Sequence, residues 1–183
     1  MKTNHLILFN VILTFANWGF SQTDPIAPSP EMAKKIGLNG VHFGFVQPLW
    51  IHKKDTSFWL TDKENYIIGF PMGLNLSTAG KLLLDFEMVP FIKPFLDKND
   101  QLSVHLLLHP GILYPLGNSW TLGLRAAFEI GQNQAGFTLL VNKSFPIMKN
   151  TRGFIELVFP QRYGPSSTDG FSNIFAVHVG IGL

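Results

Sequence analysis

Residues 119–131 read SWTLGLRAAFEIG, a stretch in which bulky apolar side chains alternate with small or polar ones. In an extended chain, one face carries Trp120, Leu122, Leu124, Ala126, Phe128 and Ile130, and the other carries Thr121, Gly123, Arg125, Ala127, Glu129 and Gly131. Successive side chains of a β-strand point to opposite faces, so this period of two predicts a strand with one apolar face.

The same alternation recurs along the chain, while helical periodicity is absent. Near the C-terminus, for example, Phe175, Val177 and Val179 alternate with small or polar residues. The predicted strands are 36–48, 63–77, 81–93, 101–114, 119–131, 135–146, 152–162 and 171–183. Eight such strands separated by turn-forming residues predict an all-β, antiparallel, up-and-down β-barrel. Because proline removes a donor from the strand ladder, we expect bulges or early strand ends at Pro71, Pro90, Pro110 and Pro160.

The composition suggests that lipid, rather than water, surrounds this barrel. Hydrophobic residues make up 46% of the chain and charged residues only 14%, whereas soluble domains carry roughly a quarter charged residues. The less apolar face of each strand consists mainly of Gly, Ala, Ser, Thr, Asn and His, which suit the narrow inside of an eight-stranded barrel. After residue 16, no stretch reaches the roughly 18 apolar residues of a spanning helix. We therefore expect a transmembrane barrel with its apolar stripes facing outward.

The N-terminus predicts export. Lys2 precedes an apolar run from Leu6 to Ala16, and Gly19-Phe20-Ser21-Gln22 follows as the cleavage region. This order is typical of a cleaved signal peptide, which we assign to residues 1–22. Residues 23–35 contain three prolines and form a predicted periplasmic linker, so the barrel itself covers 36–183. The chain has no Cys, which excludes disulfides and thiolate metal sites.

In its strand pattern, the segment 36–183 resembles the small outer-membrane barrels typified by the OmpA transmembrane domain and OmpX. The resemblance implies an integral protein of the Gram-negative cell outer membrane, in contact with membrane lipids and lipopolysaccharide. Such barrels usually end in an aromatic residue, whereas this chain ends in Leu183. Trp50, Trp59, Tyr66, Trp120 and Tyr163 fall near predicted strand ends, as the aromatic belts of membrane barrels require.

The inner face is expected to hold an ionic network. A buried Arg among carboxylates is costly unless it is paired, so we predict salt bridges centred on Arg125. Simple filling of the barrel is the alternative reading. The predicted lumenal polar residues are His42, Asp85, Glu87, Arg125, Glu129, Glu156 and His178.

The histidines do not predict a metal site. His105 and His109 are four residues apart, which separates them by roughly 13 Å along a strand. His42 and His178 lie on the first and last strands, which are neighbours in a closed barrel, but two histidines without a third ligand are a weak site. We expect neither a metal nor another cofactor.

One group of residues could support catalysis. Ser103, His105 and Glu129 lie at the outer ends of adjacent predicted strands, in reach of a nucleophile, base and orienter arrangement. Lipid A deacylases of the outer membrane place His before Ser and turn both toward lipid, whereas here the order is reversed and both face inward. A lipid A-modifying enzyme, a deacylase or acyltransferase, therefore stays an alternative to a non-catalytic protein.

Surface binding is the main functional expectation. Segment 49–62 is a predicted connection that combines Trp50, Phe58 and Trp59 with charged residues, which is more apolar than a solvated loop requires. It could contact lipid headgroups or a partner, and the alternative is that it simply extends the first hairpin above the membrane. Nucleic acid is not expected, because the chain has no basic run. We expect a structural or surface-interaction protein, with a secreted soluble lipocalin-like barrel that binds an apolar ligand as a further alternative.

Overall fold

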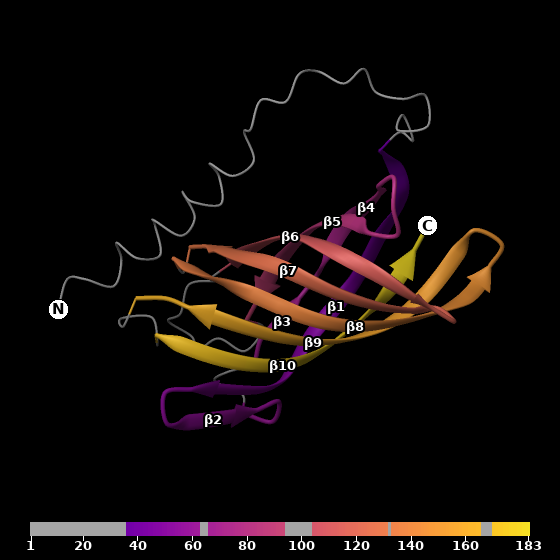
Figure 1. Ribbon diagram of the computed structural model, residues 1–183. Helices are drawn as coiled ribbons and strands as arrows, with labels where there is room; N and C mark the ends of the chain where they lie inside the picture. The colour runs from indigo at the N-terminus through magenta and orange to yellow at the C-terminus, as the bar shows by residue number, and fades with distance from the viewer. Residues whose placement is uncertain (1–35, 63–65, 94–103, 132, 166–169) are drawn as a thin grey trace, which may run out of the picture. The chain divides into compact units, whose positions relative to one another are not determined.

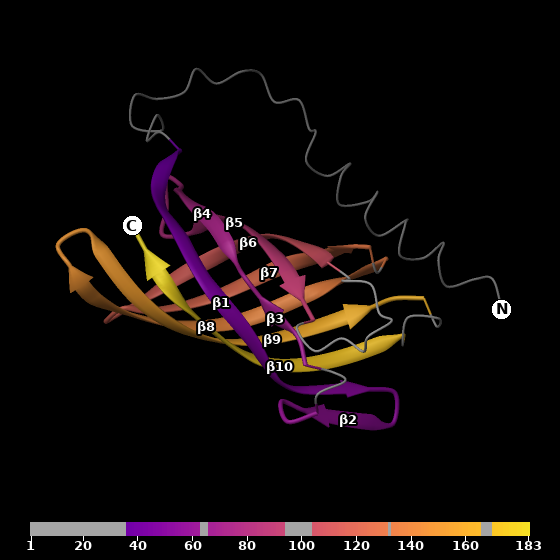
Figure 2. The same ribbon diagram turned by 180° about the vertical axis from the view of Figure 1, so that it is seen from behind.

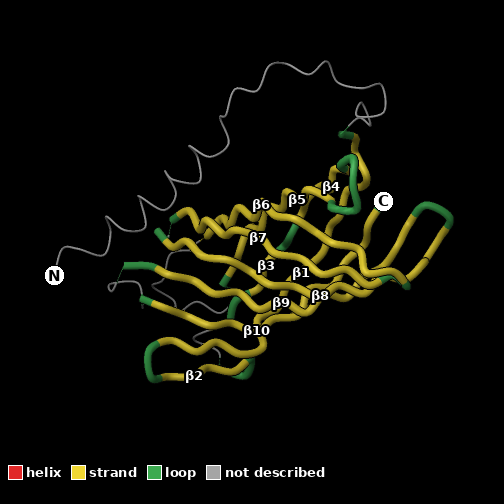
Figure 3. Tube along the Cα trace, in the orientation of Figure 1, coloured by secondary structure: helices red, strands yellow, loops and turns green. Residues whose placement is uncertain are grey.

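The described part of the chain is an antiparallel β-structure, as Figure 3 shows. The computed structural model describes residues 36–62, 66–93, 104–131, 133–165 and 170–183. Its strands are β1 (Gly37–Lys53), β2 (Thr56–Trp59), β3 (Ile68–Gly69), β4 (Met72–Ser77), β5 (Leu83–Ile92), β6 (Val104–Gly117), β7 (Trp120–Ile130), β8 (Gln134–Met148), β9 (Thr151–Tyr163) and β10 (Phe171–Gly182). The all-β prediction is confirmed. The predicted signal peptide, the linker 23–35 and Ser103 lie outside the described residues.

The strands form a sheet whose two ends pair with each other (Figure 1). Each strand from β5 to β10 pairs with the next, and β10 pairs with β1 from His42↔Gly182 to Lys53↔Ser172. Figure 2 shows β1 from behind, with β4 on one side. Because the sheet closes into a ring, it has one inner and one outer face. We call the end with Gly37 and Gly182 the terminal end, and the end with Lys53 and Tyr163 the hairpin end.

The second predicted strand, 63–77, is interrupted. β3 and β4 occupy its place between β1 and β5, and Phe70 and Pro71 separate them. Pro71 has no amide hydrogen to donate to a ladder. Backbone hydrogen bonds nevertheless bridge the gap, from Gly44 N to Pro71 O at 3.0 Å and from Phe70 N to Pro90 O at 3.0 Å.

The expected bulges lie elsewhere. Strands β5, β6 and β9 run through Pro90, Pro110 and Pro160 without a register shift, so the prediction for these three prolines is wrong. The pairing of Pro90 with Leu106 shows that the ladder geometry continues past a missing donor. The register shifts fall between Leu38 and Gly40, Pro48 and Trp50, Pro115 and Gly117, and Pro146 and Met148. Three of these four shifts do begin at a proline, Pro48 within β1 and Pro115 and Pro146 near the ends of β6 and β8.

Segment 49–62 is not a solvated connection but a hairpin that extends the first strand, which was the alternative interpretation. β1 continues to Lys53, and a turn with Lys54 at φ 51° leads into β2. Trp50 pairs with Trp59 and Ile51 with Phe58. Apolar side chains thus face each other across both faces of the hairpin, which explains why a segment with charges at its tip still forms one.

Side-chain burial follows the predicted alternation. Leu124 and Phe128 are 43% and 50% exposed on the outer face, whereas Arg125 and Ala127 between them are 3% and 0% exposed on the inner face. The buried apolar residues are Val46, Val89, Leu107, Leu113, Ala127, Leu140, Phe154, Val158 and Ala176. Most are small or medium aliphatic residues, so the core lies inside the ring while large apolar side chains cover its outside.

Candidate functional site

The centre of the ring holds a buried ionic cluster. Three alternate strands of the ring place Asp85 and Glu87 of β5, Arg125 of β7 and Glu156 of β9 on the inner face at one level. The Arg125 guanidinium contacts all three carboxylates, at 2.5 Å to Asp85 Oδ2, 3.3 Å to Glu87 Oε1 and 2.8 Å to Glu156 Oε1. Each of these side chains is at most 3% exposed. One cation thus links three strands across the ring.

Polar side chains from other strands form further hydrogen bonds with the oxygens of these carboxylates. Glu87 accepts hydrogen bonds from His42 Nε2 at 3.2 Å and from His109 Nδ1 at 3.1 Å. His178 Nδ1 lies 3.2 Å from Glu156 Oε1. The amides of Asn75 and Asn142 donate to Asp85 at 2.6 Å and to Glu156 at 3.2 Å, respectively. Buried carboxylates need such partners, because an unsatisfied charge away from water is destabilising.

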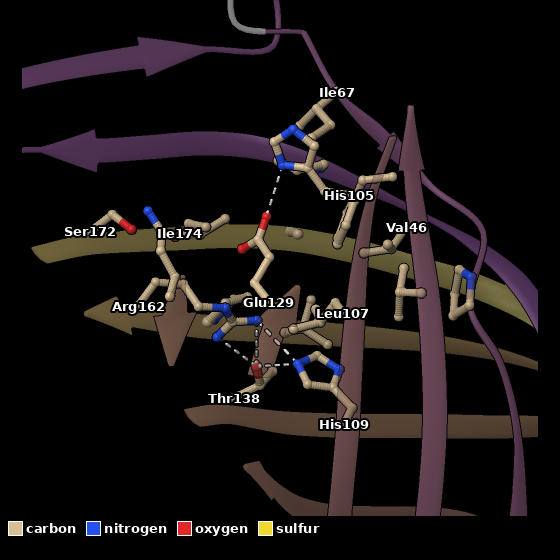
Figure 4. Close-up of a pocket in the computed structure, with 18 of the residues that line it drawn as sticks. Val46, Ile67, His105, Leu107, His109, Glu129, Thr138, Arg162, Ser172 and Ile174 are labelled. Carbon is tan, nitrogen blue, oxygen red and sulfur yellow. Dashed lines mark hydrogen bonds and ion pairs between the residues drawn. The ribbon is translucent and has the colours of Figure 1, made fainter. Parts of the chain in front are cut away.

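Arg162 of β9 extends the cluster toward the hairpin end (Figure 4). Its guanidinium donates to Thr138 Oγ1 at 3.2 Å and to His109 Nε2 at 3.1 Å. Arginine can only donate, so His109 Nε2 is an acceptor here and Nδ1 carries the hydrogen that Glu87 accepts. A directional chain, Arg162 to His109 to Glu87, therefore fixes the tautomer of His109.

The structure brings six of the seven predicted lumenal residues together. His42, Asp85, Glu87, Arg125, Glu156 and His178 belong to the central cluster. Glu129 does not, because it lies nearer the hairpin end and is 3.2 Å from His105 Nδ1. Sequence reasoning left His109, Thr138 and Arg162 out of the network. For Arg162 the sequence does hold an indication, since Arg162 lies on the same face of β9 as Glu156.

The catalytic candidates are placed in part. His105 and Glu129 form a hydrogen-bonded pair facing into the ring, and Ser103 lies outside the described residues. His105 and His109 make contacts with different acids, Glu129 and Glu87, as expected from their separation along β6. Within the described residues, no group of three or more His, Asp or Glu side chains has a metal-binding arrangement.

The cluster separates two cavities inside the ring. The hairpin-end cavity has a volume of about 230 Å³, and the terminal-end cavity about 420 Å³. Arg125 and His178 line both of them. A charged layer thus lies between the two cavities.

The described residues contain no helix with the length and apolar character needed to cross a membrane. The comparisons with protein-family models and with curated proteins find no match to this chain.

Proposed function

We propose that the chain is an integral outer-membrane protein of the OmpA and OmpX type, an eight-stranded up-and-down transmembrane β-barrel with a structural or surface-interaction role and no catalytic turnover. β1 with β10 and the strands between them supply eight ring positions when β3 and β4 count as one and β2 is an extension of β1. The strands β5 to β10 have 10 to 15 residues, enough for the roughly 9–11 residues that cross a bilayer at a tilt.

The observation that carries the proposal is the apolar outer face. Large hydrophobic side chains that are 37% to 55% exposed recur on the outside of the ring, including Phe86, Ile112, Leu124, Phe159 and Ile181. A contiguous apolar surface of this kind is unfavourable in water and favourable in hydrocarbon. A soluble lipocalin-like barrel would instead need these stripes inside, with charged residues on its surface.

The ends of the strands carry residues suited to membrane interfaces. Trp120 begins β7 at the terminal end, where the Lys143 ammonium lies 4.9 Å from its ring centroid. At the hairpin end, the rings of Tyr163 and Phe171 are 4.9 Å apart. Aromatic rings and basic side chains are favoured at the level of lipid headgroups.

A pair of arginine substitutions tests the environment of the outer face. Leu124 lies in the middle of β7, while Met148 ends β8 and is 72% exposed. In a bilayer, Leu124→Arg should lower the free energy of unfolding by about 2–4 kcal/mol and Met148→Arg by about 0–1 kcal/mol, because the cost of Arg depends on depth. Urea unfolding in phospholipid vesicles measures both. In water, neither change would be costly, so equal small effects would contradict the proposal.

Cell fractionation provides the independent test of location. We expect the mature protein in the outer-membrane fraction, extractable only with detergent, and a shift in gel mobility on boiling. Recovery in the soluble periplasmic or secreted fraction would support the lipocalin-like alternative instead.

The lipid A-modifying alternative retains one supporting observation, the hydrogen bond between His105 and Glu129. The non-catalytic proposal predicts that Ser103→Ala leaves lipid A acylation unchanged, as measured by mass spectrometry of lipid A from cells expressing each form. Loss of an acylation change that the unmodified protein produces would establish the enzyme.

Surface interaction is proposed for the β1–β2 hairpin. Figure 1 shows β2 at the outer side of the ring beside the end of β1. Trp59 is 62% exposed there, and Leu60 follows it with 38% exposed. Together with the stacked rings of Trp50 and His52, 5.8 Å apart, these residues form an apolar surface suited to lipid headgroups or a surface partner.

A further inference from the structure

We propose that the hairpin-end cavity is a binding site for a small amphipathic monocarboxylate of the size of a medium-chain fatty acid, held by Arg162. The inference goes beyond the proposed function and does not depend on it, because the cavity lies on the inner face of the closed sheet, whatever surrounds the outer face.

The cavity has an apolar wall. Its deeper part, next to the ionic cluster, is formed by Val46, Val89, Leu107, Val158 and Ala176. Ile174 lies next along β10 toward the hairpin end. The interior of an eight-stranded ring is narrow enough for side chains to fill it. Here the inward residues at this level are mostly Val and Ala, and about 230 Å³ stays open. An apolar cavity of about 150 Å³ already accepts benzene, so this one has room for a short alkyl chain.

Arg162 supplies a cation that no carboxylate among the described residues contacts directly. Its side chain is buried, with 3% of the residue exposed. All of its hydrogen bonds go to uncharged acceptors, namely the backbone oxygens of Phe137 and Gln161, Thr138 Oγ1 and His109 Nε2. Among the described residues, no carboxylate lies within the 4.0 Å of an ion pair with Arg162, in contrast to Arg125 with its three.

Glu129 lines the same cavity and acts on Arg162 through its charge, but its hydrogen bond goes to His105. Figure 4 shows Glu129 directed toward His105, with which it forms a 3.2 Å contact, while Arg162, Thr138 and His109 meet on the other side of the cavity. Buried charges are normally paired, because an unpaired charge away from water is costly. A ligand carboxylate entering the cavity would provide the missing counter-ion through charge-assisted hydrogen bonds.

Two further residues that line the cavity also favour a negatively charged ligand. Lys53 and Lys93 line this cavity as well. Glu87, at its base, is already bound by Arg125 and two histidines. The arrangement thus combines an apolar interior with a cationic wall, which selects a molecule with one anionic group and an apolar body over a neutral or cationic one.

Radiolabelled octanoate is the probe for this site. The mature protein is reconstituted in lipid nanodiscs, its fold is checked by heat-dependent gel mobility, and binding to empty nanodiscs is subtracted. We expect saturable binding of one octanoate per chain, with octanol, the neutral counterpart, at least about tenfold weaker, as a charge-assisted hydrogen bond implies.

Two variants locate the ligand, and one serves as control. Arg162→Met removes the cation and should weaken octanoate binding by about tenfold or more. Ala176→Leu keeps the cation but fills the apolar wall, and it should also weaken binding. Arg152→Met, an exposed arginine at the terminal end, should leave binding unchanged.

Three results would overturn the inference. Equal octanoate binding by the unmodified protein, Arg162→Met and Ala176→Leu would place the ligand outside this cavity. Octanol binding as tight as octanoate binding would refute a carboxylate site. Absence of saturable binding to a correctly folded protein would exclude the ligand class, while leaving the membrane location, which fractionation tests separately, unaffected.

Discussion

Replacing Arg125 should destabilise the protein more than any exposed arginine, because its guanidinium neutralises three buried carboxylates. In Arg125→Met, a side chain of similar length fills the space, so the loss of charge dominates over the creation of a cavity. Asp85, Glu87 and Glu156 would then face one another at the centre of the ring, each at most 3% exposed. Removing one partner of a buried ion pair costs about 3–5 kcal/mol, and we expect the upper part of that range here.

Urea unfolding in phospholipid vesicles, followed by tryptophan fluorescence, measures this loss as a change in the free energy of unfolding. Arg152→Met is the matched control, because Arg152 is exposed and its side-chain hydrogen bonds within the described part of the chain go to the hydroxyls of Ser119 and Ser144.

A second substitution tests the electrostatic origin of the effect. Adding Glu156→Gln to Arg125→Met removes one of the uncompensated charges and should restore part of the lost stability. If Arg125→Met and Arg152→Met cost the same, or if the added Glu156→Gln lowers stability further, the cluster does not stabilise the fold through charge neutralisation.

Two further outcomes follow from the packing inside the ring. Gly44→Val should lower the free energy of unfolding by about 1–3 kcal/mol or prevent folding, because a Cβ at Gly44 would lie 2.7 Å from His178 Nε2 and 3.1 Å from the backbone of Gly180. Gly80→Val, where the nearest atom is 3.9 Å from the added Cβ, is the control in the same urea assay. Equal stability of the two variants would contradict close packing where β1 meets β10. In planar lipid bilayers the protein should show no ion conductance, since the Arg125 layer separates the two cavities, and steady single-channel currents from the unmodified protein would show that this layer opens.

The strand positions could be predicted because burial alternates along each strand. Segment 119–131 became β7 (Trp120–Ile130) and segment 152–162 became β9 (Thr151–Tyr163). The β1–β2 hairpin was only the alternative interpretation of this segment, because Lys53, Lys54 and Asp55 suggest a solvated connection. These charges occupy only the tip, whereas the pairing of Trp50 with Trp59 that sustains the hairpin depends on which residues face each other across two strands.

The composition of the ionic cluster was predictable from strand faces, but its extent was not. The alternation of side chains along a strand places Glu129 and Arg125 on the same face of β7. Their separation of four residues, roughly 13 Å along a strand, puts them at different levels of the ring. Which level each residue reaches depends on the stagger between strands, and the bulges near Pro48 and Pro115 alter that stagger locally. The cavity beside Arg162 depends on the same stagger and has no signature in the sequence.

The junction between β1 and β10 has a kinetic consequence. His42 pairs with Gly182, and nearly all the residues of the ring lie between these two partners in the sequence. The other pairs between described strands join segments much closer in sequence, Gly37 with Ser77 at the widest, and form more locally. Bringing distant segments together carries the largest loop-closure entropy, which makes contacts of this kind late and slow during folding. A circular permutant that links the two ends covalently and opens the Gly117–Trp120 turn would convert the slowest contact of the chain into a local one.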